Sequence, residues 1–226
     1  MRAGRSAGPG PRQNRVTPVG DLVADPARGT LTGNRGCLHD GDERIVRYRV
    51  GRRWIACALE FRGRRGPVMP PGRWTALFFL DEATALAAGH RPCFECRRED
   101  AERFRAAWAA GNGLDGRPGA DDIDRVLEAE RLAGPGRKRT WRAAAAELPD
   151  GAFVRDGDLA LAVAGDALLP WCPGGYGAPR ARPPGRAAVE VLTPPSTVRA
   201  IAAGYGAGLA SPWPRDGRRR GPGPAG

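Results

Sequence analysis

The sequence predicts an α+β fold in which a β-hairpin and helix unit is followed by a helical segment and a small β-rich unit. Between residues 53 and 62, successive side chains can be assigned alternately to two faces, as the two-residue period of a strand requires. Residues 96–110 place Phe104 and Trp108 four positions apart, on one side of a helix. From residue 148 onward, short β-prone runs are separated by Pro and Gly clusters.

The composition predicts loose ends around an ordered centre. The 33 Gly and 22 Pro residues gather at the ends of the chain and in the expected loops. The expected divisions are a disordered arm (1–20), the hairpin and helix unit (21–112), a helical connector (113–147), the β-rich unit (148–210) and a disordered basic tail (211–226). The arm and the tail lack an apolar period, so they cannot bury enough apolar surface to order themselves.

The expected hairpin consists of residues 45–50 and 53–62, on either side of Gly51. Within the second run, Ile55 and Cys57 share one face and the residues between them share the other. We expect the face of Cys57 to point inward.

The remaining elements follow from capping and breaking signals. Residues 74–80 are a third strand candidate, and Asp81 is the expected N-cap of a short helix that Gly89 ends. Residues 96–110 form the second expected helix, and Asp121 starts a third. The β-rich unit contributes β runs over 152–154, 159–164 and 187–192, and one short helix over 195–203.

The chain has a formal net charge of +11, which favours polyanionic partners. Lys138 is the only lysine among 36 cationic residues, so a biased composition that leaves a solvated arginine surface is the alternative explanation. No apolar run approaches the ~18 residues needed to span a bilayer, and no membrane partner is expected. Five cysteines without a secretory segment indicate a cytoplasmic protein.

A Cys-x-x-Cys pair, Cys93 and Cys96, lies in the segment GHRPCFECRR at the entrance of the second helix. Two cysteines at this spacing can present both sulfurs to one ion, and zinc prefers four such ligands in a tetrahedron. Cys57 is the expected third ligand, and Cys37, preferred over His39, is the fourth. The alternatives are a redox dithiol for the pair and an ordinary buried thiol for Cys57.

The two histidines exclude several classes of enzyme. His39 and His90 are too few for metallohydrolases with several histidine ligands, and they disfavour histidine-dependent nucleases and Ser-His-Asp hydrolases. We expect His90 to pack or to form hydrogen bonds. We expect Cys172, which lies apart from the other cysteines, to be structural.

Residues 77–98, LFFLDEATALAAGHRPCFECRR, resemble the second half of the Ada-type metal-binding domain of bacterial DNA repair proteins. The pattern of that family is a strand, a short helix and a Gly-aromatic-Arg-Pro-Cys-x-x-Cys turn, and here His90 replaces the aromatic residue. The resemblance implies zinc bound by the two cysteines of the turn and two earlier ones, and contact with the DNA backbone. The family's earlier cysteines lie close together, whereas Cys37 and Cys57 are twenty positions apart here.

Arginines near the cysteines are expected to form one basic face around the zinc-stabilised unit. They are Arg52, Arg53, Arg62, Arg64, Arg65, Arg91, Arg97 and Arg98. The leading hypothesis is a zinc protein, with zinc in a structural role, that engages nucleic acid, DNA rather than RNA, through this face. This hypothesis leans away from an enzyme without deciding whether catalysis occurs.

Two other classes of function stay open. One is an enzyme, in its sharpest form a protein that accepts a methyl group on zinc-bound Cys37 or Cys57. The other is an interaction module that binds a protein or small ligand through Trp171, Tyr176 and Trp213 of the β-rich unit and the tail.

Overall fold

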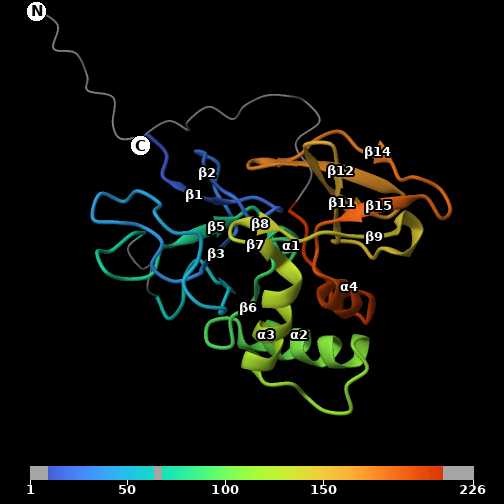
Figure 1. Cartoon of the computed structure of the whole chain (residues 1–226), viewed down its shortest axis with the longest axis horizontal. Coiled ribbons are helices and arrows are strands. Elements are labelled where there is room, and N and C mark those ends of the chain that lie inside the picture. Colours follow the sequence, from blue (N-terminus) through green and yellow to red (C-terminus); the bar gives the residue numbers. More distant parts are fainter. Residues whose placement is uncertain (1–9, 64–67, 211–226) are drawn as a thin grey trace, which may run out of the picture.

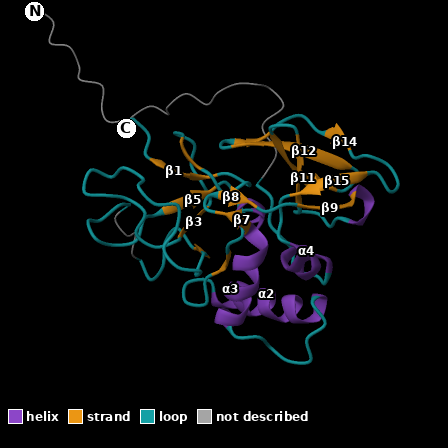
Figure 2. Ribbon diagram, in the orientation of Figure 1, coloured by secondary structure: helices purple, strands orange, loops and turns teal. Residues whose placement is uncertain are grey.

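The computed structural model describes residues 10–63 and 68–210 of the 226-residue chain. Helices and two larger sheets are both present, which confirms the mixed α+β class. The N-terminal and C-terminal sheets lie beside each other, and the helices α2 to α4 gather along one side of them (Figures 1 and 2).

The N-terminal sheet has six strands in the order β2-β1-β5-β3-β4-β6. Two pairs, β1 with β5 and β4 with β6, are parallel, and the other pairs are antiparallel. The strands are β1 (Gln13–Val16), β2 (Leu22–Ala24), β3 (Leu31–Asn34), β4 (Ile55–Cys57), β5 (Leu77–Phe79) and β6 (Arg91–Pro92).

Strand β1 corrects the prediction of a disordered arm over residues 1–20. It pairs with β2 and β5, and its Asn14 and Val16 side chains are buried. The apolar content of QNRV is too low to reveal a strand, because sheet pairing rather than periodicity orders this segment. Residues 1–9 and the expected tail 211–226 lie outside the described residues.

The expected hairpin of 45–50 with 53–62 is wrong in its pairing. Strand β4 pairs with β3, whereas Ile45 forms only an isolated bridge with His39. Val46 and Val50 are about half exposed, at 54% and 49%, so the first run has no buried face that would hold it in a sheet.

Gly33 of β3 explains why β3 and β4 can lie so close together. A Cβ atom at this position would lie 2.1 Å from the carbonyl oxygen of Ile55. Only glycine allows this approach of the two backbones.

In the described part of the chain, the four helices lie within about two residues of the expected ranges. They are α1 (Glu82–Ala87), α2 (Arg98–Gly111), α3 (Ala120–Arg131) and α4 (Pro195–Ala202). Asp81 caps α1 by accepting a hydrogen bond from the backbone N–H of Thr84 at 2.8 Å. Within residues 10–63 and 68–210, none of the helices combines the length and the apolar character needed to cross a bilayer.

The C-terminal sheet is antiparallel in the order β13-β12-β11-β10-β15-β9, and β14 pairs with β12. Its strands are β9 (Trp141–Ala144), β10 (Phe153–Asp156), β11 (Leu159–Ala164), β12 (Ala167–Cys172), β13 (Gly175–Tyr176), β14 (Arg180–Ala181) and β15 (Ala188–Val191). A separate hairpin joins β7 (Leu132–Gly134) to β8 (Arg137–Lys138), and a 3₁₀ turn spans Ala145–Glu147. Strand β9 therefore belongs to the sheet, although it lies in the expected helical connector.

The expected units share their cores. Leu86 of α1 packs in one cluster with Phe104 of α2, Ile123 of α3 and Ile201 of α4. A second cluster joins Leu80 and other residues around α1 to the C-terminal sheet. Ala85 of α1 also packs in a cluster with Phe79 of the N-terminal sheet, so helix α1 supports both sheets.

The aromatic side chains of the β-rich unit hold α1 in place. The Tyr176 hydroxyl donates to Oδ2 of Asp81 at 2.6 Å, and the Trp171 indole N–H donates to Oγ1 of Thr84 at 3.0 Å. Tyr176 is buried, so these two residues do not form an exposed aromatic groove. Trp213 lies outside the described residues.

Candidate metal centre

Strand pairing brings Cys57 and Cys93 together. Strands β4 and β6 run parallel, with Ile55 beside Arg91 and Ala56 beside Pro92. The next positions in the same register are the two cysteines, and the backbone N–H of Cys93 donates to the Ala56 carbonyl at 3.0 Å. Two segments that are 36 residues apart in the sequence therefore deliver adjacent sulfurs.

The end of α1 directs the chain into this pairing. Gly89 has φ of +92°, and a Cβ atom there would lie 2.7 Å from the Cβ of Arg131. Only glycine accommodates both the left-handed backbone and this contact. The chain then enters β6 through His90, whose side chain is fully buried.

A turn after β6 returns the chain to the first two sulfurs. The backbone N–H of Arg97 donates to the Cys93 carbonyl at 3.1 Å, and α2 begins directly afterwards. The sulfurs of Cys57, Cys93 and Cys96 consequently all lie within 4.8 Å of one another. A zinc ion with Zn–S bonds of about 2.3 Å holds its sulfurs roughly 3.8 Å apart, so these three side chains could hold one metal ion.

The face of Cys57 was predicted wrongly. Trp54 and Ala56 are buried in the core at 0% and 1% exposure, whereas Ile55 and Cys57 are only half-buried on the opposite face. Strand alternation was correct, and only the choice of the inward face was not.

The sulfur cluster favours thiolates. The backbone N–H of Glu95 donates to the Cys93 sulfur and that of Ala58 to the Cys96 sulfur, both at 3.4 Å. A hydrogen bond from the Cys57 thiol lowers the pKa of Cys93 to about 5 and also lowers the pKa of Cys96. The same contacts raise the pKa of the Cys57 thiol, whose proton a bound metal ion would displace.

Two guanidinium groups pack against the ring of Trp54, the residue just before β4. The guanidinium of Arg35 lies 3.9 Å from the Trp54 ring centroid, and that of Arg131 lies 4.1 Å from it. His90 packs on Trp54 and accepts a hydrogen bond from Arg35, which confirms its expected packing role. Burial foremost, with the nearby Arg35 and Arg131 charges, holds the pKa of His90 well below its usual value.

Neither candidate for the fourth ligand lies at the cluster. No other Cys, His, Asp or Glu of residues 10–63 and 68–210 has a ligand atom within 4.8 Å of all three sulfurs. The β3–β4 register places Thr32 beside Cys57, so Cys37 lies past the opposite end of this strand pair. His39 instead binds the Thr75 hydroxyl through Nδ1 at 2.6 Å. A zinc-bound thiolate at Cys37 is therefore excluded by the geometry.

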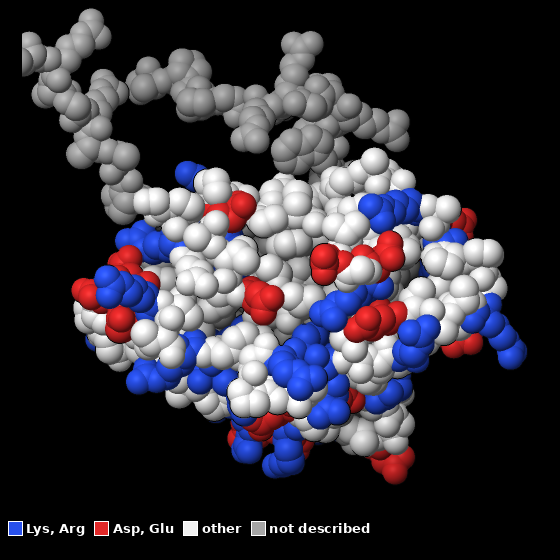
Figure 3. Space-filling model, turned by 45° about the horizontal axis from the view of Figure 1, so that its top comes forward, with Lys and Arg blue, Asp and Glu red and all other residues white. Residues whose placement is uncertain are grey.

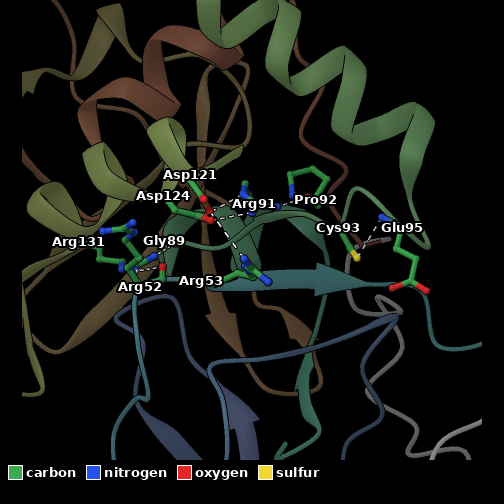
Figure 4. Close-up of polar contacts among 10 residues, drawn as sticks. All are labelled: Arg52, Arg53, Gly89, Arg91, Pro92, Cys93, Glu95, Asp121, Asp124 and Arg131. Atoms are coloured by element: carbon green, nitrogen blue, oxygen red, sulfur yellow. Dashed lines mark hydrogen bonds and ion pairs between the residues drawn. The ribbon is translucent and has the colours of Figure 1, made fainter. Parts of the chain in front are cut away.

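Arg91 does not belong to a basic face. Its guanidinium donates to both carboxylate oxygens of Asp124 in α3, at 2.7 and 2.9 Å, and both side chains are at most 4% exposed (Figure 4). The sequence hid this role because the acidic partner is 33 positions away. Arg91 therefore ties β6 to α3.

Arg97 is also committed to an internal contact. Its side chain is 10% exposed and donates to Glu82 at 2.6 Å and to Asp100 at 2.9 Å. Glu82 in turn accepts a hydrogen bond from the Tyr205 hydroxyl at 2.6 Å. Arg97 thus joins α1, α2 and the segment after α4, and it was wrongly expected to face a nucleic acid.

The other described members of the predicted face are exposed. These four are Arg52, Arg53, Arg62 and Arg98, whereas Arg64 and Arg65 lie outside the described residues. On the face seen in Figure 3, basic and acidic side chains are interspersed. Residues 1–9, 64–67 and 211–226 hold eight of the 36 cationic residues and one of the 25 acidic ones, so they carry +7 of the net charge of +11.

A hollow of about 540 Å³ lies beside the sulfur cluster. It opens between the start of β3, the segment after β4 and the first turn of α2. Its lining residues are Thr30, Leu31, Ala58, Leu59, Phe61, Glu95, Cys96, Arg97, Arg98, Glu99 and Asp100. Of the three clustered cysteines, only Cys96 lines the hollow. The sequence did not indicate this hollow, because its lining comes from three separate segments of the chain.

Comparison with known proteins adds no relative. No protein-family model, curated protein or solved structure matches the chain. The resemblance of residues 77–98 to the Ada-type domain stays a prediction.

Proposed function

We propose that this chain is a zinc protein in which Cys57, Cys93 and Cys96 bind the ion. The convergence of three sulfurs from β4 and from the turn before α2 carries this proposal. Three thiolates suit zinc, a borderline-soft cation, better than they suit calcium or magnesium. All five cysteines are free, as expected in the reducing cytoplasm, where we place the protein.

The metal has a structural role in this proposal. Strand β4 is only three residues long and β6 only two, so few backbone hydrogen bonds fix the turn that leads into α2. An ion bound across the two segments would lock the register of β4 with β6 and fix the start of α2.

Metal analysis of the purified full-length chain tests this proposal. We expect one zinc ion per chain, and Cys93→Ser should lose it. Cys172→Ser is the matched control, because Cys172 is exposed at the end of β12, outside the cluster. Unchanged zinc content in Cys93→Ser would contradict the assignment.

We also propose that the protein engages nucleic acid, DNA rather than RNA, through exposed arginines. The net charge of +11 and the exposure of Arg52, Arg53, Arg62 and Arg98 support the proposal. Such contacts to phosphates release counterions, so affinity should fall steeply as salt rises.

A salt titration with a DNA duplex tests the surface. Replacing Arg52 and Arg62 with Gln should make the slope of log affinity against log salt less steep by about 1.8, since each phosphate contact contributes about 0.9. Arg117→Gln with Arg186→Gln is the matched control, because both are exposed arginines in loops away from the cysteines. A DNA affinity that does not depend on salt would refute the nucleic-acid proposal. Equal salt slopes for the Arg52/Arg62 variant and the Arg117/Arg186 variant would refute the assignment of DNA binding to Arg52 and Arg62.

A further inference from the structure

The metal cluster supplies three protein ligands, whereas zinc takes four. Among the described residues, only Cys57, Cys93 and Cys96 bring ligand atoms within 4.8 Å of one another. Sites with three protein ligands leave the fourth position for water or for an external molecule. What this position faces therefore decides what the metal can bind.

The hollow beside Cys96 is large enough for more than water. Its volume of about 540 Å³ lies within the ~300–1,000 Å³ typical of small-molecule sites. Its lining includes the large apolar side chains Leu31, Leu59 and Phe61. Leu59 is 44% exposed although it is a large apolar residue, so its side chain is accessible to a ligand.

The charge around the open metal position disfavours an anionic fourth ligand. A divalent ion with three thiolates carries one net negative charge. The lining adds the carboxylates of Glu95, Glu99 and Asp100 against the guanidiniums of Arg97 and Arg98. The charge of Arg97 is already balanced by Glu82 and Asp100, although its buried Nη1 has no hydrogen-bond partner among the described residues. A neutral donor atom is the better fourth ligand.

We propose that the fourth metal position opens into this hollow and takes a ring nitrogen of an unpaired nucleobase. A heterocyclic nitrogen is a neutral donor that suits zinc, as imidazole does. The base ring would pack on Leu59 and Phe61, since aromatic and apolar side chains are the usual platforms for unstacked bases. Arg98 is an exposed residue of the lining, and the exposed guanidinium of Arg62 lies 4.9 Å from the Phe61 ring centroid, so both are near enough to contact the flanking phosphates. This inference rests on the proposed metal site.

Cobalt(II) substitution of the full-length chain tests the open position, because tetrahedral cobalt absorbs visible light in a manner that depends on its ligands. We expect thiolate-to-cobalt bands on metal addition, and a saturable shift of the visible bands with imidazole and with guanosine. Inorganic phosphate should produce no shift. Absence of the thiolate bands would overturn the metal site itself.

With cobalt bound, the other outcomes bear on this inference alone. No shift with imidazole would refute an open position, and a shift with imidazole or phosphate but not with guanosine would refute the nucleobase. Leu59→Asp should weaken guanosine binding about tenfold or more at unchanged metal content. Leu114→Asp, at a leucine of equal exposure in the loop after α2, is the control, and equal guanosine affinity in both variants would contradict the proposed packing on Leu59.

Discussion

Replacing Asp124 with Ala tests whether Arg91 is a structural residue rather than a nucleic-acid contact. The change removes both carboxylate oxygens, at 2.7 and 2.9 Å, from a guanidinium that is buried in the core. Breaking a buried ion pair by removing one partner costs about 3–5 kcal/mol, because the other charge stays buried without its partner.

The structure favours the lower end of this range. Arg91 would keep a hydrogen bond to the Pro92 carbonyl at 3.2 Å and a cation–π contact with Phe94 at 5.2 Å. We therefore expect a loss of about 3 kcal/mol in the free energy of unfolding. With a urea dependence of about 2 kcal/mol/M, the unfolding midpoint should fall by about 1.5 M.

Urea unfolding of a charge-free variant provides the control. Asp124→Leu combined with Arg91→Met removes both charges, so it should recover most of the loss seen in Asp124→Ala. Its affinity for DNA should equal that of the unmodified protein, since neither side chain reaches solvent. A loss below about 1 kcal/mol for Asp124→Ala, or a charge-free variant with weakened DNA binding, would refute the structural role.

Three further predictions follow. Burial and neighbouring guanidiniums lower the pKa of Lys138 to about 7 in the folded protein. Between pH 7 and about 10 the unfolded chain therefore binds one more proton than the folded chain. The free energy of unfolding should rise with pH across this window. Lys138→Met should flatten that rise in denaturation curves measured at several pH values. Tyr176→Phe removes the hydroxyl donor to Oδ2 of Asp81, which keeps only the backbone N–H of Ala210 at this oxygen, and should cost about 1.5–3 kcal/mol in urea unfolding. A loss near zero would contradict the bridging role of this contact. Gly33→Ala would force its methyl group against the Ile55 carbonyl, separate β3 from β4 and weaken zinc binding in a chelator competition, although no ligand is altered.

Local signals predicted the helices and part of the C-terminal sheet well. Asp81 marks the start of α1 and Gly89 follows its end, as expected. Strand β11 spans the expected residues 159–164. These predictions succeed because capping, left-handed glycine and strand alternation depend on a few neighbouring residues.

Pairing between distant segments could not be predicted in this way. Strand β4 pairs with β3 and not with the expected run 45–50. The sequence did not reveal this pairing, because Gly33, which permits the close approach of the two strands, leaves no periodic signal. The ion pair of Arg91 with Asp124 was hidden for a similar reason, because an arginine reads as basic surface until its acidic partner is located.

By itself, the sequence determined that Cys93 and Cys96 form a local pair and that Cys57 lies on a strand. The tertiary structure decided that these three sulfurs meet, that Cys37 and His39 do not join them, and that Cys96 faces a hollow. Sulfur spacing within a turn is set by the backbone of four residues. The meeting of β4 with β6 is set by strand register, by Gly33 and Gly89, and by the Trp54 core, which act together only in the folded chain.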